Sequence, residues 1–173
     1  MEKKKVYLSG PDRLRKDRIE RFKEYKKLCE SYGFELLEYP IELFKAKDSK
    51  ENSCRIAEKR LQLIRECDVL IADTRDFRSY VEPYSESAFE LGMGYGLKKK
   101  LYAYMPDNRT CAERYSGNKH LNENGIIVDE NGISFEPGPV NLMLEYGAQV
   151  IQGDLEDALK KAKADLEGGD NVY

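Results

Sequence analysis

The chain has 173 residues but no tryptophan, one histidine and four cysteines. The cysteines are scattered without a C-x-x-C pair, so we expect no zinc or other metal site and a reducing cytoplasmic location; they are Cys29, Cys54, Cys67 and Cys111. The single histidine, His120, lies in a polar stretch. Catalysis by Ser-His-Asp or Cys-His groups would depend on it, and we set both aside.

Long apolar runs and a strong net charge are also absent. After a basic start, only Val6, Tyr7 and Leu8 precede the polar Ser9, which is too short for a signal peptide. No segment reaches the length of a membrane span. The formal net charge of −3 gives no broad cationic field. We therefore expect no membrane and no nucleic acid polymer as partner, and one globular domain with a real core.

The glycine patterns of nucleotide-binding loops are missing as well. The run Gly92-Met93-Gly94-Tyr95-Gly96 falls inside an expected helix rather than at a strand-to-helix turn, and no G-x-x-x-x-G-K-[ST] occurs. This argues against a Rossmann-type dinucleotide site. Gly92 and Gly96 share one helix face, which predicts close packing on a sheet or on a partner helix.

What the sequence does contain is a steady alternation of strand and helix patterns. The predicted strands are 4–9, 34–39, 68–73, 100–105 and 148–151; the predicted helices are 14–32, 56–66, one that follows Tyr84 and contains Glu90, 140–146 and 155–166. An exposed loop is expected through 45–52, and a hairpin pairs 126–128 with 133–135 around Asn131-Gly132. The alternation predicts an α/β fold, a parallel sheet with helices on both faces.

In such a sheet, ligands bind beyond the carboxyl ends of the strands. Tyr7, Ser9 and Gly10 end the first strand, and the segment from Asp73 to Arg78 follows the third. We expect both to converge with the beginning of the Glu90 helix, whose polar residues Tyr84, Ser85 and Ser87 would then face the ligand.

Glu90 is the candidate functional carboxylate among three acidic residues at this helix, the others being Glu82 and Glu86. A structural alternative is open, because Ser87-Ala88-Phe89-Glu90 fits the capping-box pattern. The apolar neighbours Phe89 and Met93 would give a functional Glu90 a dry setting, and the helix N-terminus would offset part of its charge.

Four segments in order resemble the nucleoside 2-deoxyribosyltransferase family: Lys5-Val6-Tyr7-Leu8-Ser9-Gly10-Pro11, Asp68-Val69-Leu70-Ile71-Ala72-Asp73, Ser87-Ala88-Phe89-Glu90-Leu91-Gly92 and Asn141-Leu142-Met143. The resemblance implies a flavodoxin-like doubly wound parallel sheet over residues 1–167, followed by a polar tail, 168–173. It implies a homo-oligomer with active sites at subunit interfaces. The expected activity is transfer of 2-deoxyribose between nucleobases in nucleotide salvage, with nucleosides and nucleobases as small-molecule partners and no metal or organic cofactor.

The resemblance also implies roles for individual residues. Glu90 would be the nucleophile at the anomeric carbon, and Tyr7 would hold that carboxylate by a hydrogen bond. Asn141 and Met143 resemble residues that a neighbouring subunit contributes to the sugar pocket. Tyr173 resembles a terminal tyrosine near the ligand in some members, although a frayed tail is the simpler interpretation.

The chain departs from its relatives at three places. Tyr84 stands where many relatives carry an aspartate that holds the sugar hydroxyl, and Glu86 where glycine is frequent. Lys59-Arg60 stands where some relatives have an acidic base-binding residue. Two alternatives therefore stay open: an N-glycosidase of nucleoside monophosphates or deoxynucleosides, and a non-catalytic nucleotide-binding module.

Overall fold

A five-stranded parallel sheet forms the centre of the molecule. The computed structural model describes residues 3–38, 50–78 and 81–168. The strand order is β2-β1-β3-β4-β7, and every neighbouring pair is parallel. The strands are β1 (Lys4–Ser9), β2 (Phe34–Leu36), β3 (Val69–Asp73), β4 (Lys100–Met105) and β7 (Gln149–Gln152). This is the flavodoxin-like order, and it confirms the predicted fold class.

The order follows from the apolar content of the strands. Every residue of β3 is buried, as a strand covered by helices on both faces requires, and β1 and β4 flank it. The short β2 and the half-buried β7 form the edges of the sheet. The carboxyl ends of β1 and β3 therefore lie side by side at the middle of the sheet, where Ser9 pairs with Ala72.

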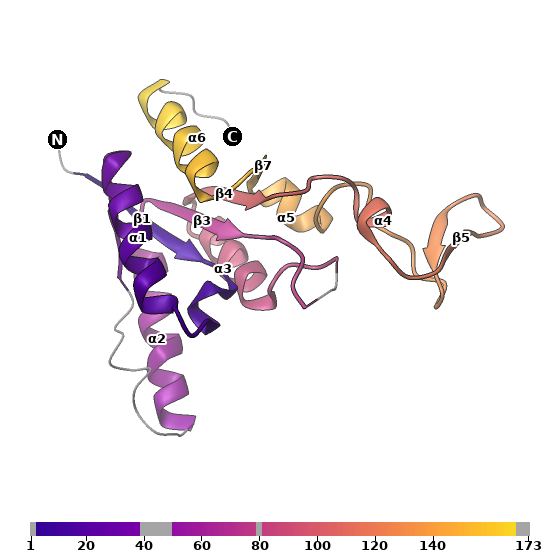
Figure 1. Ribbon diagram of the computed structural model, residues 1–173, viewed down its shortest axis with the longest axis horizontal. Helices are drawn as coiled ribbons and strands as arrows, with labels where there is room; N and C mark the ends of the chain where they lie inside the picture. Colours follow the sequence, from indigo (N-terminus) through magenta and orange to yellow (C-terminus); the bar gives the residue numbers. More distant parts are fainter. Residues whose placement is uncertain (1–2, 39–49, 79–80, 169–173) are drawn as a thin grey trace.

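Helices cover both faces of the sheet (Figure 1). On one face α1 (Arg18–Ser31) and α6 (Leu155–Gly168) pack through Cys29 and Leu159. On the other face α2 (Lys50–Glu66), α3 (Ser85–Gly96) and α5 (Leu142–Gly147) pack through residues such as Ile64 and Leu91. Each helix buries one side only, which is the pattern of an amphipathic surface helix.

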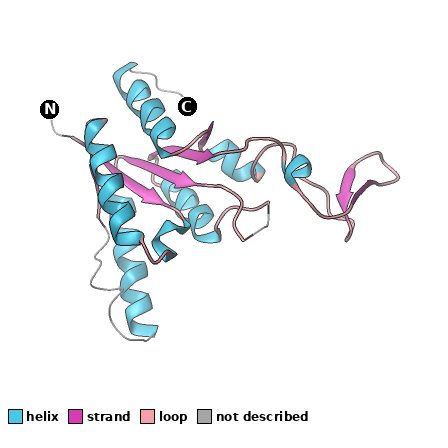
Figure 2. Cartoon of the chain, in the orientation of Figure 1, coloured by secondary structure: helices cyan, strands magenta, loops and turns pink. Residues whose placement is uncertain are grey.

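Residues 107–139 form an extension that projects away from the sheet (Figures 1 and 2). It contains the short helix α4 (Cys111–Arg114) and an antiparallel pair, β5 (Lys119–Leu121) with β6 (Ile127–Asp129). The predicted turn at Asn131-Gly132 is present, with an antiparallel bridge between Val128 and Ser134, but its second arm is limited to that bridge. The main pairing of β6, with β5, was not predicted. The Asn122 side chain accepts hydrogen bonds from the backbone N–H groups of Asn124 and Ile126 and fixes the turn on the other side of β6.

Several boundaries differ from the sequence predictions. The first helix is split into a 3₁₀ turn, η1 (Pro11–Leu14), and α1, and β2 ends at Leu36 rather than at residue 39. Helix α2 begins at Lys50, so that the predicted loop ends earlier; residues 39–49 lie outside the described chain. Gly33 follows α1 with φ of 87°, the left-handed end that a glycine favours.

The glycine prediction for α3 needs a correction. A β-carbon on Gly92 or Gly96 would contact nothing within 4 Å, so these two glycines do not carry the close packing. Gly94 does, because its β-carbon would lie 2.7 Å from Cδ2 of Leu101. The close approach of α3 to the sheet thus depends on the middle glycine of the run.

Across residues 3–38, 50–78 and 81–168, no helix combines the length and the apolar content needed to cross a bilayer.

Candidate active site

Glu90 is a buried carboxylate between α3 and the sheet. It lies in the second turn of α3, and only 2% of its surface is exposed. Its helix face also carries Glu86 and Gly94, one turn away on either side. Because Gly94 lets α3 approach the sheet, Glu90 reaches the carboxyl end of β1.

The carboxylate of Glu90 accepts hydrogen bonds from three side chains. Tyr7 Oη donates to Oε1 at 2.7 Å, and Ser9 Oγ donates to Oε2 at 2.5 Å. Both donors point from the same face of β1, since residues two apart on a strand share a face. Arg60, on α2, donates to Oε1 from Nε at 2.8 Å and from Nη2 at 2.5 Å. The hydrogen bond expected between Tyr7 and Glu90 is therefore present.

The capping-box interpretation of Glu90 is wrong. Helix α3 begins one turn earlier than that pattern requires, with Tyr84 at the N-cap position. The Ser87 hydroxyl is buried without a hydrogen-bond partner, and Glu90 contacts Tyr7, Ser9 and Arg60 instead of backbone N–H groups. The groups that exclude water from Glu90 also differ from those expected. Phe89 is 66% exposed, so the sheet and α2 exclude water instead.

Two arginines and a second glutamate surround Glu90. Arg13, from η1, is buried; its Nη2 donates to Glu86 Oε2 at 2.6 Å, and its Nη1 lies 3.6 Å from Glu90 Oε2. Arg60 Nη1 forms an ion pair with the same Glu86 oxygen. Burial raises the pKa of Glu86, but the Tyr84 hydrogen bond and the two arginines outweigh burial and leave that pKa below its ordinary value.

Sequence reasoning missed this charge cluster, which consists of Arg13, Arg60, Glu86 and Glu90. The sequence indicates Glu86 as an acidic residue near the start of the Glu90 helix and Arg60 as a departure from the family pattern, but it gives Arg13 no role. Its members come from three separate elements, η1, α2 and α3. The one available signal was the spacing of Glu86 and Glu90, which places both carboxylates on one helix face.

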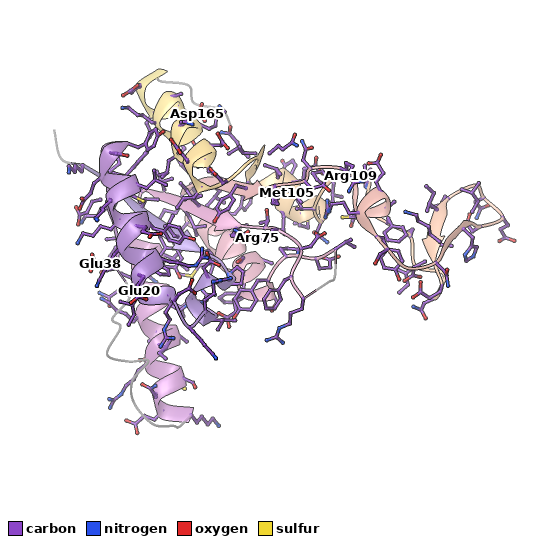
Figure 3. The ribbon with its side chains drawn as sticks, in the orientation of Figure 1. Glu20, Glu38, Arg75, Met105, Arg109 and Asp165 are labelled. Carbon is purple, nitrogen blue, oxygen red and sulfur yellow. The ribbon has the colours of Figure 1, made fainter. Side chains whose placement is uncertain are left out.

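Gly10 and Asp73 meet where β1 and β3 end. A β-carbon on Gly10 would lie 2.9 Å from Cβ of Asp73, so a larger residue at position 10 would displace the aspartate. Oδ1 of Asp73 accepts hydrogen bonds from Arg75, through the backbone N–H at 3.1 Å and Nε at 2.9 Å. Burial raises the pKa of Asp73, and Arg75 offsets only part of that rise. Figure 3 shows Arg75 near the centre of the molecule.

Tyr84 fills the space beside Arg13 instead of opening toward solvent. It is buried, its ring packs against Phe77 at a tilt of 56° with centroids 4.8 Å apart, and the Arg13 guanidinium carbon lies 5.2 Å from the ring centroid. Ser85 faces elsewhere, into a groove on another side of α3.

The α3–α5 groove is a cavity of about 630 Å³ on the side of α3 opposite Glu90. Its lining includes Ser85, Leu91, Asn141, Met143 and Tyr146. Asn141 accepts a hydrogen bond from the Met143 backbone N–H and so caps α5. Met143 is 75% exposed. Within one chain, the structure therefore does not bring Asn141 and Met143 to Glu90. Tyr173 lies outside the described residues.

Among the described residues, no group of three or more histidine, cysteine, aspartate or glutamate side chains could hold a metal ion. The chemistry available around Glu90 is that of an oriented carboxylate flanked by hydroxyl and guanidinium donors. Such a carboxylate can attack an electrophilic carbon or stabilise a developing positive charge.

Comparison with known proteins gives a consistent result. A sequence profile described as nucleoside 2-deoxyribosyltransferase matches residues 6–143. A solved 2-desoxiribosyltransferase from Leishmania mexicana is 28% identical with a TM-score of 0.73, over 92% of this chain and 97% of that chain. A conserved protein from Enterococcus faecalis V583 is 17% identical with a TM-score of 0.52, over 93% and 99% of the two chains, a likeness of fold alone. No curated protein sequence matches.

Proposed function

Because this chain belongs to the nucleoside 2-deoxyribosyltransferase family, we propose that it transfers 2-deoxyribose from one nucleobase to another through a covalent intermediate on Glu90. One observation carries the proposal: Glu90 is buried, yet it accepts hydrogen bonds from Tyr7, Ser9 and Arg60 at the carboxyl end of β1. A buried carboxylate with this many donors is held in one orientation, as a nucleophile must be.

The proposed reaction has two displacement steps. A Glu90 oxygen bonds to the anomeric carbon while the glycosidic C–N bond breaks, and the electron pair of that bond leaves with the first base. The transition state has oxocarbenium character, which the adjacent carboxylate stabilises. A nitrogen of the second base then attacks the same carbon and releases Glu90, so that the configuration is retained overall. Ping-pong kinetics follow from this sequence.

Substrate contacts are proposed for the residues around the ends of β1 and β3. Gly10 and Asp73 lie in close contact there, and the raised pKa of Asp73 makes its carboxyl better suited to hydrogen-bond a base than that of an exposed aspartate. Tyr84 and Ser87 flank the beginning of the Glu90 helix. No metal or organic cofactor takes part in the proposed reaction.

We propose further that Asn141, Met143 and the tail residue Tyr173 serve a neighbouring subunit. Asn141 and Met143 line the α3–α5 groove, on the opposite side of α3 from Glu90 of their own chain. A homo-oligomer in which this groove faces a second copy would place them at that copy's site. Mixing a Glu90→Ala variant with a Met143→Ala variant would then regenerate activity in hybrid oligomers that neither variant has alone.

Hydrolysis of nucleoside 5′-monophosphates is the second candidate. It is favoured by the guanidinium groups of Arg13 and Arg60, which lie beside Glu90 and Glu86 and could pair with a phosphate. Water would then take the place of the second base. The two candidates share the first displacement step and differ in the substrate and in what discharges the intermediate.

The test is incubation of the purified protein with deoxyinosine and free cytosine, followed by chromatography. Deoxycytidine should form with the intact protein and should be absent with Glu90→Gln, which keeps the size of the side chain and removes its charge. Glu30→Gln, at an exposed carboxylate of α1 on the other face of the sheet, is the matched control.

Other products would redirect the proposal. Hypoxanthine with free deoxyribose would establish hydrolysis, and the same assay with deoxynucleoside monophosphates would follow. Nucleoside binding with no base release by either protein would contradict both enzymatic proposals and leave a nucleotide-binding module.

A further inference from the structure

The two oxygens of Glu90 are held unequally. Oε1 accepts three hydrogen bonds, one from Tyr7 Oη at 2.7 Å and two from Arg60 at 2.8 and 2.5 Å. Oε2 accepts one hydrogen bond, from Ser9 Oγ at 2.5 Å, and Arg13 Nη1 lies 3.6 Å from it. Each carboxylate oxygen offers two in-plane lone pairs. Oε1 therefore has none left, whereas Oε2 keeps one.

Arg60 contributes most of this asymmetry. Its side chain extends from α2 and is 13% exposed, so it stands almost fully inside the protein. Nε and Nη2 both donate to Oε1 of Glu90, while Nη1 pairs with Oε2 of Glu86. The guanidinium is a rigid plane with its donors at fixed angles. Binding Glu86 through Nη1 therefore fixes the direction in which Nε and Nη2 point.

We propose that Arg60 is a positioning residue that holds Oε1 of Glu90 so that Oε2 is the attacking oxygen, and that Glu86 orients Arg60 for this role. The inference deepens the proposed function and rests on it. Arg60 does not contact the reacting carbon in this scheme; it acts through the carboxylate. Glu86 lies one helical turn before Glu90, and in this proposal it pairs with the Arg60 guanidinium and holds it in place.

The charges of the cluster support this arrangement. Among the described residues of the cluster, two carboxylates, Glu86 and Glu90, face two guanidinium groups, Arg13 and Arg60, so that each carboxylate lies beside a positive charge. The lowered pKa of Glu86 keeps it an anion, able to hold both arginines, at neutral pH. Removing Glu86 would take away the ion pair at Nη1 that directs the guanidinium plane of Arg60 toward Oε1 of Glu90.

The experiment compares Arg60→Lys, Arg60→Ala, Glu86→Gln and the double variant Arg60→Ala/Glu86→Gln in the base-exchange assay. Misorientation of a catalytic group can cost about 100-fold in rate, and we expect a kcat loss of that order for Arg60→Ala with KM within about twofold. Lysine keeps the charge but not the planar fork, so Arg60→Lys should lose about 10-fold. Glu86→Gln should also lose about 10-fold, and nothing further when it is added to Arg60→Ala.

Two measurements separate positioning from a structural role. Arg55→Ala, on the same helix, removes an exposed arginine that pairs only with Glu51 among the contacts described for it, and it should keep the full kcat. Methylguanidinium added to Arg60→Ala should restore part of kcat, because a free guanidinium can occupy the vacated space. If Arg60→Ala does not fold, Arg60→Lys and Glu86→Gln carry the same test.

Three results would overturn the inference while the proposed function stands. The first is base exchange by Arg60→Ala and Arg60→Lys at the full kcat, and the second is an effect of these variants on KM alone. The third is that Glu86→Gln lowers kcat by the same factor in the presence of Arg60 and in the Arg60→Ala variant. A loss confined to KM would assign Arg60 to substrate binding. Failure of the intact protein to release a base from any nucleoside or nucleotide would remove the proposed function itself, and this inference with it.

Discussion

Tyr7 and Glu90 are 83 positions apart in the chain, and the phenol of Tyr7 donates a hydrogen bond of 2.7 Å to the Glu90 carboxylate. Tyr7 is fully buried on β1, and Glu90 is buried on α3. The contact joins the first strand of the sheet to the helix that covers it. A buried hydrogen bond to a charged group contributes more free energy than one between neutral groups. The Tyr7–Glu90 pair is therefore the first to test by substitution.

Tyr7→Phe should lower kcat by about 10-fold to 100-fold, since a hydrogen bond to a charged group contributes about 1.5–3 kcal/mol. Glu90 would keep Ser9 and Arg60, so the fold should persist. Tyr102→Phe is the matched control, because it also removes a buried tyrosine hydroxyl, one that donates to Asp165 at 3.0 Å. The measurement is the steady-state kcat of base exchange by both variants. Equal losses of kcat would show that the Tyr7 hydroxyl has no specific role in the reaction.

Gly94→Ala should destabilise the fold, whereas Gly96→Ala should not. The new β-carbon at position 94 would lie 2.7 Å from Leu101 Cδ2 and 3.3 Å from Leu70 Cδ1, both in the core. Overpacking of about 1–3 kcal/mol exceeds the gain of about 1 kcal/mol from helix propensity. At position 96 nothing lies within 4 Å, and only the gain applies. Urea unfolding measures both; a stabilised Gly94→Ala would contradict the packing described for α3.

Asp73→Asn should raise the free energy of unfolding more at neutral pH than at acid pH. Burial raises the pKa of Asp73 above its ordinary value of 3.8, so the folded chain binds the proton more tightly than the unfolded chain. The contribution of Asp73 to stability therefore falls as pH rises from below 3.8 through the folded pKa. Asparagine cannot ionise. The Asp73→Asn variant should therefore become more stable than the intact protein as pH rises from below 3.8 through the folded pKa, and should show no gain in stability below that range.

The measurement for Asp73 is the free energy of unfolding of both proteins across this pH range. Asp107→Asn is a control of opposite sign, because hydrogen bonds from Arg109 lower the pKa of Asp107 to about 2. Its contribution should be present above the ordinary pKa and be lost as pH falls through about 2. The same pH trend for both substitutions would contradict the assignment for Asp73.

Arg114→Ala should loosen the extension without disturbing the sheet. The Arg114 side chain is buried and donates to the carbonyl oxygen of Pro139 at 2.8 Å and to Asp76 Oδ1 at 2.9 Å. Its loss leaves the partly buried carbonyl oxygen of Pro139 and the Asp76 carboxylate without this donor, at a cost of about 1 kcal/mol. Amide hydrogen exchange should rise in β5 and β6 and stay constant in β1 and β3.

Arg109→Ala is the control for the extension. Arg109 is exposed, its side chain pairs only with Asp107 among the contacts described for it, and Figure 3 shows it at the base of the extension. Exchange in β5 and β6 should therefore remain unchanged. Equal effects of the two substitutions would mean that Arg114 does not anchor these residues.

Much of the fold was predictable because its signals are local. The apolar runs 4–9, 68–73 and 100–105 gave β1, β3 and β4 within a residue, since a buried parallel strand needs apolar side chains on both faces. The turn at Asn131-Gly132 was predicted as well, and Val128 and Ser134 form a bridge across it. The pairing of β5 with β6 was missed, because the turn between them depends on the side-chain hydrogen bonds of Asn122.

The sequence by itself determined the sheet, its helices and the polar residues that end β1 and β3, because strand and helix periodicities are written into neighbouring positions. It also indicated Glu90 as the candidate carboxylate through the family resemblance, because the local pattern alone favoured a helix cap. Only the tertiary structure decided that Glu90 contacts Tyr7, Ser9 and Arg60, and that Gly94 rather than Gly92 lets it do so. These contacts join residues of β1, α2 and α3. The spacing of Glu86 and Glu90 indicates only that they share a helix face, and no local pattern indicates which residues of the other elements contact them.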